Sequence, residues 1–242
     1  MRRKRKPWID PECKESLHLG LKMAPGIKKL SEALQLQLPY SFDPDGKLSL
    51  GKPRGTPSAV LILLEPQEVR QVESWSPWDS TVLLTKRSET VEHHKGQISF
   101  PGGVEDPEDR LAGGLQRTAL REAHEELGIQ SAQIQVVGEL PALPTITGFW
   151  ISPIVAVPKT EHWGFPLSAE PKTVETAEVF RANLRGLDAP GIWKQEWVEH
   201  RTPSGILSRH PVDAFYWSEH RIWGATGAML KNLIERLKRV ER

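Results

Sequence analysis

The sequence predicts an α/β fold with a mixed sheet, and several features of the chain indicate this class. Two apolar runs that hold β-branched residues, SAVLILLE (58–65) and STVLLTKR (80–87), are typical of buried strands. After GQISF, another short strand candidate, a PGG turn and a polar loop lead to an expected helix at 115–127, which Gly128 closes. The chain ends on a second expected helix, at 223–240. Strand, glycine loop and helix therefore follow one another along the chain.

The segments between these two helices add further strands. QIQVVGEL (133–140) and FWISPIVAV (149–157) are expected as strands, separated by the Pro- and Thr-rich loop LPALPTITG. Residues 161–175 are expected to form a polar loop, and EVFRANLRGL (178–187) a strand that turns into a helix. WKQEWVEH and DAFYWS are late strand candidates. In the last helix an apolar stripe at helical spacing predicts packing on the sheet; its members are Met229, Leu230, Leu233, Ile234 and Leu237.

The length of 242 residues suits one catalytic domain with an extension. Residues 1–56 are basic and then mixed, hold one expected helix at 26–36, and end in the turn-rich segments DPDGK and GKPRGTP. We interpret them as an N-terminal extension, and residues 57–242 as the catalytic domain. The basic start MRRKRK is interpreted as a solvated tail, with a contact for phosphate or an anionic surface as the alternative.

Composition and charge exclude several classes of protein. The formal net charge of +1 argues against a globally basic nucleic-acid binder, so no nucleic-acid partner is expected. No apolar segment approaches the roughly 20 residues that span a bilayer, and the N-terminus lacks the apolar stretch of a secretory signal. We therefore expect a cytoplasmic protein with no membrane partner, and leave a homodimer open. The lone Cys13 excludes an intramolecular disulfide and cannot by itself build a zinc site.

Three carboxylates share one face of the expected helix at 115–127. Glu122, Glu125 and Glu126 stand at positions i, i+3 and i+4, where each like-charged pair costs about 0.2–0.5 kcal/mol. They also lie near the helix C-terminus, whose partial negative charge disfavours them. A solvated acidic face is one interpretation. The alternative is a site for Mg²⁺ or Mn²⁺, which prefer hard oxygen ligands and bridge to substrate phosphates, and two such cations could activate water.

FPGG followed by REAHEELGI resembles the Nudix box, the family pattern G-x5-E-x7-R-E-U-x-E-E-x-G-U, in which U is a bulky aliphatic residue. The second half of the pattern is matched at its fixed positions by Arg121, Glu122, Glu125, Glu126, Gly128 and Ile129. The first half departs from the pattern. Five residues separate Gly103 from Asp109, which stands where the family has glutamate, and the loop before Arg121 is longer. Glu105, Glu108 and Asp109 are the candidates for the loop carboxylate, with Asp109 favoured.

LLTKRSETVEHHKGQISFPGG resembles the signature of the coenzyme A diphosphatase branch, LLTxR[SA]x3Rx3Gx3FPGG. The mismatch is Glu92, which stands where the branch has arginine. Two further segments, LPTITGFWISPIV and RIWGATGAML, also resemble that branch, so the resemblance covers roughly residues 57–238. It implies cleavage of coenzyme A or acyl-CoA. A nucleoside diphosphate sugar, a dinucleoside polyphosphate or NADH is the alternative substrate, and a non-catalytic nucleotide sensor is the alternative class.

The resemblance also implies a fold, a cofactor and roles for individual residues. The fold is an α/β/α sandwich around a mixed β-sheet, the cofactor is Mg²⁺ or Mn²⁺, and the partner is a nucleotide-type small molecule. Arg121 would orient the glutamates, and Glu122, Glu125 and Glu126 would bind the metal. Glu175 and Glu178 are late candidates for the general base; for Glu175, a solvated loop glutamate is the equally weighted alternative. Arg87, Gly102 and Gly103 are expected to contact the substrate, although a structural ion pair would also account for Arg87.

Overall fold

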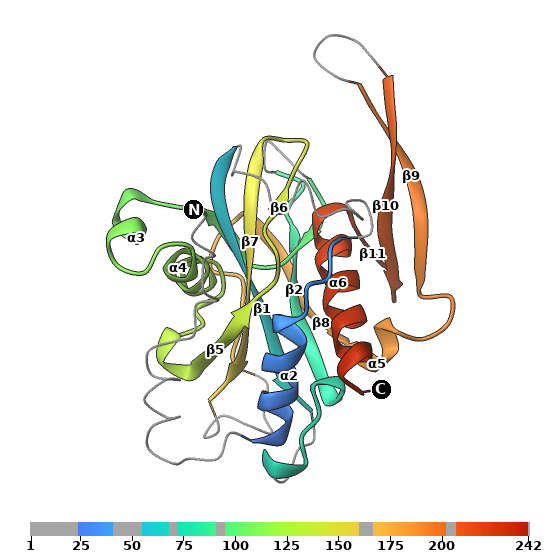
Figure 1. Cartoon of the computed structure of the whole chain (residues 1–242). Coiled ribbons are helices and arrows are strands. Elements are labelled where there is room, and N and C mark those ends of the chain that lie inside the picture. The colour runs from blue at the N-terminus through green and yellow to red at the C-terminus, as the bar shows by residue number, and fades with distance from the viewer. Residues whose placement is uncertain are drawn as a thin grey trace, which may run out of the picture.

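The structure is a computed structural model of the chain, and it describes residues 24–40, 55–67, 72–90, 95–159, 167–201 and 207–241. Glu92 and the basic start of the chain lie outside the described residues. A mixed sheet lies at the centre, with helices on both of its faces (Figure 1). No helix of the described ranges is long and apolar enough to cross a membrane.

Eight strands form the central sheet in the described part of the chain. They are β1 (Thr56–Pro66), β2 (Ser80–Arg87), β3 (Ile98–Ser99), β4 (Gly102–Val104), β5 (Ile134–Glu139), β6 (Leu143–Pro144), β7 (Phe149–Pro158) and β8 (Thr176–Asn183). The main path runs β3-β2-β1-β7-β5, with β4 beside β1, β6 beside β7 and β8 beside β2. β1 and β7 are parallel, whereas the other pairs are antiparallel, so the sheet is mixed as predicted.

Strand β1 changes its partner along one edge. Its first half pairs with β4 through Ser58–Val60, and its last residues pair with β2 through Leu64–Pro66. Between these two regions the Leu61 N–H donates to the carbonyl of Pro101 at 2.9 Å. This arrangement brings the end of β2 and the glycines of β4 to the same half of β1, where the candidate site lies.

The two faces of the sheet are covered by different helices. On one face Ala59, Leu61 and Leu63 of β1 pack against α4 (Leu115–Leu127). Because side chains alternate along a strand, Ile62 and Leu64 face the other way, toward α2 (Pro25–Gln35) and α6 (Gly224–Glu241). Figure 1 shows the three layers, with α4 on one side and α2 and α6 on the other. The predicted α/β/α sandwich is confirmed.

A second, smaller sheet follows the short helix α5 (Leu184–Leu187). It consists of β9 (Trp193–Arg201), β10 (Leu207–Trp217) and β11 (His220–Trp223), in the order β11-β10-β9. β10 and β11 pack on α6, and the hairpin of β9 and β10 extends away from the main body (Figure 1). The predicted strands WKQEWVEH and DAFYWS lie in β9 and β10, whereas β11 was not predicted.

Helix α2 packs into the same core although it precedes the central sheet in the chain. It begins with Pro25, a favourable first helical residue. From α6 the buried Arg236, 1% exposed, donates hydrogen bonds to the carbonyls of Ala33, Leu34 and Leu36 at the end of α2. These bonds cap the end of α2, where the last carbonyls lack the N–H donors of a further helical turn. Part of the segment interpreted as an N-terminal extension therefore contributes to the folded unit.

Most predicted elements are present, and the differences are local. The prediction of a PGG turn was wrong in part, because Gly102 and Gly103 lie in β4 and pair with β1. The polar loop before α4 contains the short helix α3 (Pro107–Leu111), and LPALPTITG contains β6. Three short 3-10 turns complete the described elements: η1 (Val72–Ser74), η2 (Pro77–Asp79) and η3 (Ser131–Gln133).

Candidate active site

Helix α4 presents its carboxylates at the edge of the central sheet. Its buried side chains, including Ala119, Ala123 and Leu127, face β1 and fix the rotation of the helix. Gly128 ends it in the left-handed conformation, with φ at 76°, as the sequence predicted. The remaining helix face, which carries Glu122 and Glu126, is thereby turned toward β4.

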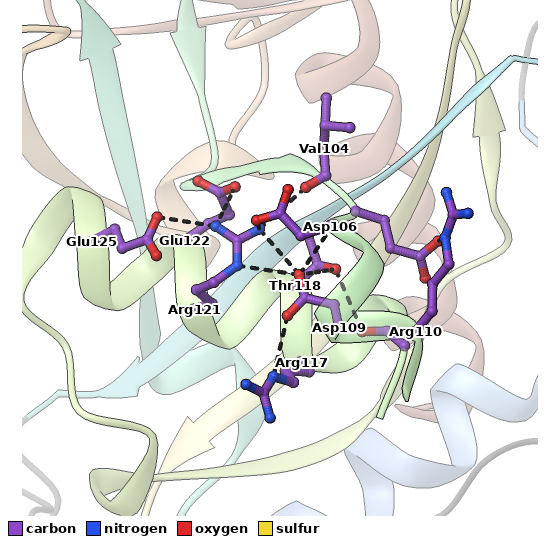
Figure 2. A network of polar contacts seen from close by, with 11 residues as sticks. Val104, Asp106, Asp109, Arg110, Arg117, Thr118, Arg121, Glu122 and Glu125 are labelled. Carbon is purple, nitrogen blue, oxygen red and sulfur yellow. Dashed lines mark hydrogen bonds and ion pairs between the residues drawn. The ribbon is translucent and has the colours of Figure 1, made fainter. Parts of the chain in front are cut away.

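Arg121 is surrounded by acidic groups (Figure 2). Its Nε and Nη2 atoms donate to Oδ2 of Asp109 at 3.2 and 3.1 Å. On the other side, Nη1 lies 2.9 Å from Glu122 Oε1 and 3.0 Å from Glu125 Oε2. Nη2 also donates to the Val104 carbonyl at 3.2 Å. A single guanidinium thus links the loop before α4, strand β4 and two of the helix glutamates.

Asp109 is the buried carboxylate of the longer loop that contacts Arg121, and the exposed Asp106 of the same loop lies 3.5 Å from Arg121 Nη2. The side chain of Asp109 is 1% exposed and also accepts hydrogen bonds from Arg117 Nε at 3.2 Å and Thr118 Oγ1 at 3.0 Å. Burial raises the pKa of Asp109, but the hydrogen bonds from Arg121 and Thr118 outweigh it, so the pKa lies below its ordinary value. Of the three loop candidates, Asp109 makes this contact, whereas Glu105 pairs with Arg110 at 2.7 Å.

A cavity of about 710 Å³ lies beside α4, at the half of β1 that pairs with β4. The catalytic and substrate candidates that line it are Arg87, Gly102, Gly103, Glu122, Glu126 and Glu175. The rest of its lining was not singled out as functional in the sequence. It comes from β1, β4, β7 and the loop before β7: Ser58, Ala59, Val60, Val104, Thr147, Phe149 and Ile151. The segment LPTITGFWISPIV carries the last three, so its resemblance was the available signal for them.

Glu125 differs from the other two helix glutamates. It does not line the cavity, and its side chain is 54% exposed and held by Arg121. Among the described residues, the set of three metal-ligand groups whose atoms all lie within 4.8 Å of one another is Glu178, Glu219 and His220, not the α4 glutamates. The structure therefore brings Glu122 and Glu126 together in the cavity and leaves Glu125 at its border.

The surroundings of Glu122 and Glu126 raise the pKa of both carboxyl groups when no cation is bound. Burial raises the pKa of Glu126 to about 7, and the negative charges of Glu122 and Glu175 add to this effect. A hydrogen bond from the Gly102 backbone and the positive charge of Arg87 oppose it. Burial also raises the pKa of Glu122, against the opposing effect of Arg121. A divalent cation in the cavity would favour the charged carboxylates instead.

The two glycines of β4 allow this strand to lie close to α4 on one side and to β1 on the other. A methyl group at Gly103 would lie 2.3 Å from Glu122 Oε1, so any larger residue would displace that carboxylate. At Gly102 a methyl group would lie 2.3 Å from the carbonyl oxygen of Ala59. The first contact is with a flexible side chain and the second with backbone. Gly103 therefore leaves space for the Glu122 carboxylate, whereas Gly102 lets β4 pair closely with β1.

Arg87 and Glu175, which both line the cavity, form an ion pair. Arg87 Nη2 lies 3.1 Å from Glu175 Oε2, and the Ser88 N–H donates to the carbonyl of Glu175 at 2.7 Å. Arg87 Nε is buried and has no hydrogen-bond partner among the described residues. The structure thus contains the ion pair considered for Arg87 and also places its guanidinium against the cavity.

The structure does not bring Glu178 to the cavity. In β8 Val179 packs on the α4 side of the sheet and Phe180 on the α6 side, so alternation directs Glu178 to the α6 side. There its Oε1 lies 3.3 Å from Nε2 of the buried His220. Of the two late carboxylates considered as a general base, only Glu175 lies in the cavity.

Comparison with known proteins places this site in a family. The family model for the NUDIX domain matches residues 56–199, which is more than half of the chain. A protein of Photorhabdus laumondii subsp. laumondii named uncharacterized Nudix hydrolase NudL is 34% identical over 158 residues, covering 65% of this chain and 78% of its own. The protein of the same name from Pectobacterium atrosepticum is 33% identical over 153 residues, covering 63% and 73%.

Solved structures include similar chains. A MutT protein from Methanosarcina mazei Go1 is 18% identical and has a TM-score of 0.43, with 79% of this chain and 99% of that chain covered. The matched domain includes β1, α4 and all of the candidate residues named above. The chain therefore belongs to the Nudix family and is a Nudix diphosphate hydrolase.

Proposed function

We propose that this Nudix hydrolase cleaves the diphosphate linkage of coenzyme A or acyl-CoA. The products would be 4′-phosphopantetheine, or its acyl ester, and adenosine 3′,5′-bisphosphate. One observation carries the proposal: Arg87, Gly102 and Gly103, which belong to the signature resembling the coenzyme A branch, line the same cavity as Glu122 and Glu126. The substrate signature and the Nudix box thus meet in one site.

The residues present fit a divalent cation. Nudix hydrolases use such cations, and the hard carboxylate oxygens of Glu122 and Glu126 face a cavity large enough for a nucleotide phosphate. The missing side chain at Gly103 leaves the space that the Glu122 carboxylate occupies. We assign Glu122, Glu125 and Glu126 as ligands of Mg²⁺ or Mn²⁺. The bound cation would supply charge neutralisation on the diphosphate and a lower pKa for the attacking water.

Arg121 is assigned as the residue that orients the ligands. It contacts Glu122 and Glu125 directly and is itself held by Asp109. Burial lowers the pKa of Arg121, but the hydrogen bond to Asp109 and the charge of Glu122 outweigh it and hold the pKa above its ordinary range. The guanidinium therefore stays charged at every relevant pH. It offsets the repulsion among the carboxylates that the sequence places on one helix face.

Glu175 is assigned as the general base of the reaction. Water attacks one phosphorus of the diphosphate, and a new P–O bond forms as the bond from that phosphorus to the bridging oxygen breaks. The electron pair of the broken bond leaves with the bridging oxygen on the other phosphate. The proton of the water passes to the carboxylate of Glu175, which lines the cavity with Glu126. Arg87 binds a phosphate oxygen through its guanidinium.

A second candidate keeps the chemistry and changes the substrate. Glu92 reverses the charge of the arginine in the branch signature and favours a different nucleoside diphosphate derivative, such as a nucleoside diphosphate sugar, a dinucleoside polyphosphate or NADH. Back-substitution tests this directly: Glu92→Arg should raise kcat/KM for coenzyme A if the signature determines the substrate.

The proposal is tested by product analysis. The protein is incubated with coenzyme A and Mg²⁺ or Mn²⁺ in water enriched in ¹⁸O, and the products are resolved by mass. The expected products are 4′-phosphopantetheine and adenosine 3′,5′-bisphosphate, with the label on the phosphorus that water attacks. A parallel panel includes ADP-ribose, a sugar nucleotide and NADH. A much higher kcat/KM for one of these than for coenzyme A would make the proposed substrate wrong.

A further inference from the structure

We propose that Glu175 occupies the phosphate-binding edge of Arg87 in the free protein, and that the diphosphate of the substrate displaces it. Binding of substrate would then free the Glu175 carboxylate, which already lines the cavity, from its contact with Arg87. This exchange rests on the proposed function of the same cavity. Until the substrate binds, the general base is held by Arg87, the same residue that then binds the substrate.

The contact between the two residues is incomplete. A guanidinium can present two parallel N–H groups to a carboxylate or a phosphate. Here Arg87 donates to Glu175 from Nη2, at 3.1 Å. The neighbouring Nε is buried and has no hydrogen-bond partner in the described ranges. The edge formed by Nε and Nη2 is therefore only half satisfied, and an oxyanion that reached both atoms would bind it better than Glu175 does.

The exposure of the two side chains indicates which of them moves. The side chain of Glu175 is 59% exposed, whereas that of Arg87 is 29% exposed. The backbones of both residues are fixed, because the Ser88 N–H donates to the Glu175 carbonyl and Arg87 pairs with Thr176 between β2 and β8. The flexible side chain of Glu175 can therefore change its rotamer without a change in the sheet. Arg87 stays in place as the anion site.

Displacement has a consequence for the reaction. The cavity already contains Glu122 and Glu126, and Glu175 is close enough to act on Glu126 electrostatically. Once Arg87 is bound to phosphate, Glu175 loses its positive partner and becomes a free carboxylate beside the diphosphate. In the free protein the same carboxylate is held by Arg87 Nη2 at 3.1 Å.

The exchange is tested by equilibrium binding of inorganic diphosphate in EDTA, so that neither turnover nor metal is involved. Isothermal titration calorimetry compares the wild-type protein with Glu175→Gln, Arg87→Gln and the double variant. Glu175→Gln should bind diphosphate about two- to fivefold more tightly than wild type, the range expected for a partly exposed ion pair. In the Arg87→Gln background the same substitution should give no gain.

A matched control separates exchange from the general loss of negative charge. Glu126→Gln removes another carboxylate from the same cavity, where Glu175 rather than Glu126 is the residue that accepts the hydrogen bond from Arg87 Nη2. The gain in diphosphate affinity from Glu126→Gln should be the same in the wild-type and Arg87→Gln backgrounds. Arg87→Lys keeps the charge without the planar fork, and it should also abolish the gain from Glu175→Gln.

Several results would overturn the exchange. They are a gain from Glu175→Gln that is equal in both backgrounds, no gain at all, or no measurable binding of diphosphate to any variant. Failure of the proposed function is a separate result, because it would be seen as absent coenzyme A turnover in Mg²⁺ while diphosphate binding and its dependence on Arg87 persist.

Discussion

Arg121 donates two hydrogen bonds to one oxygen of Asp109, from Nε at 3.2 Å and from Nη2 at 3.1 Å. Asp109 is buried and belongs to the loop that is longer than the family pattern. The same loop contains α3, whose first turn holds Asp109 and places it against the guanidinium (Figure 2). The loop carboxylate therefore reaches Arg121 despite the altered spacing.

Asp109→Asn should destabilise the protein and lower its activity. The substitution removes the charge that accepts hydrogen bonds from Arg117, Thr118 and Arg121, and a hydrogen bond to a charged group contributes about 1.5–3 kcal/mol. The free energy of unfolding from urea denaturation should fall by about that amount, and kcat should fall because Arg121 is less well placed. Glu108→Gln, an exposed change in the same loop, is the control. Equal stabilities for the two variants would contradict this role of Asp109.

The stability of the protein without divalent cations should depend on pH through Glu126. Its pKa in the folded protein is raised to about 7 from an ordinary value near 4.5. The folded state therefore holds a proton that the unfolded state has lost, and stability should decrease as pH rises from about 4.5 to about 7. Chemical denaturation in EDTA across this range measures the slope.

Glu126→Gln should flatten that slope, whereas the exposed Glu125→Gln should not. Addition of Mg²⁺ to the wild-type protein should also reduce the loss of stability near neutral pH, because the cation favours the charged carboxylate. If wild type and Glu126→Gln show parallel pH profiles in EDTA, the raised pKa is not located at Glu126.

The two glycines of β4 should respond differently to alanine. At Gly103 the added methyl group meets the end of the Glu122 side chain, which can move, so kcat/KM should fall about 10- to 100-fold with little loss of stability. At Gly102 the methyl group meets the Ala59 backbone, so the midpoint of thermal unfolding should fall. Activity assays and melting curves on both variants separate the two effects. A large loss of stability in Gly103→Ala with normal activity would contradict the assignment.

The elements with a strong local signal were predictable from the sequence. Helix α4 has buried residues at helical spacing and a terminal glycine, and its observed bounds, Leu115–Leu127, agree with the prediction. Strands β1 and β2 are continuous apolar runs and were also predicted correctly. In these segments local pattern and tertiary packing favour the same structure.

Other features depend on contacts between distant parts of the chain. Gly102 and Gly103 have no intrinsic preference for a strand, and they form β4 only because β1 supplies a pairing edge. The ion pair of Arg87 with Glu175 joins residues separated by 88 positions. To decide that Glu175 and not Glu178 lies in the cavity, the register of β8 against β2 is needed. That register places Glu178 beside His220. No local pattern carries this information.

The position of Glu125 is a further result that the helix spacing could not give. Spacing places Glu122, Glu125 and Glu126 on one face, but Glu125 is held by Arg121 at the border of the cavity. If Glu125 is a metal ligand, its carboxylate would bind the cation while it lies beside Arg121, whose guanidinium contacts both Glu122 and Glu125. The metal assignment therefore depends on testing the helix carboxylates as a set.

The most direct test of the metal site is hydrolysis by the variant that combines Glu125→Gln and Glu126→Gln, measured together with its binding of Mn²⁺. A bound cation supplies several kcal/mol of transition-state stabilisation, so kcat/KM for coenzyme A should fall by about 10³-fold or more while the fold is retained. Mn²⁺ affinity should fall in parallel, and the exposed change Glu170→Gln should alter neither quantity. Unchanged hydrolysis and unchanged Mn²⁺ affinity in the double variant would contradict the assignment of these glutamates as the metal site.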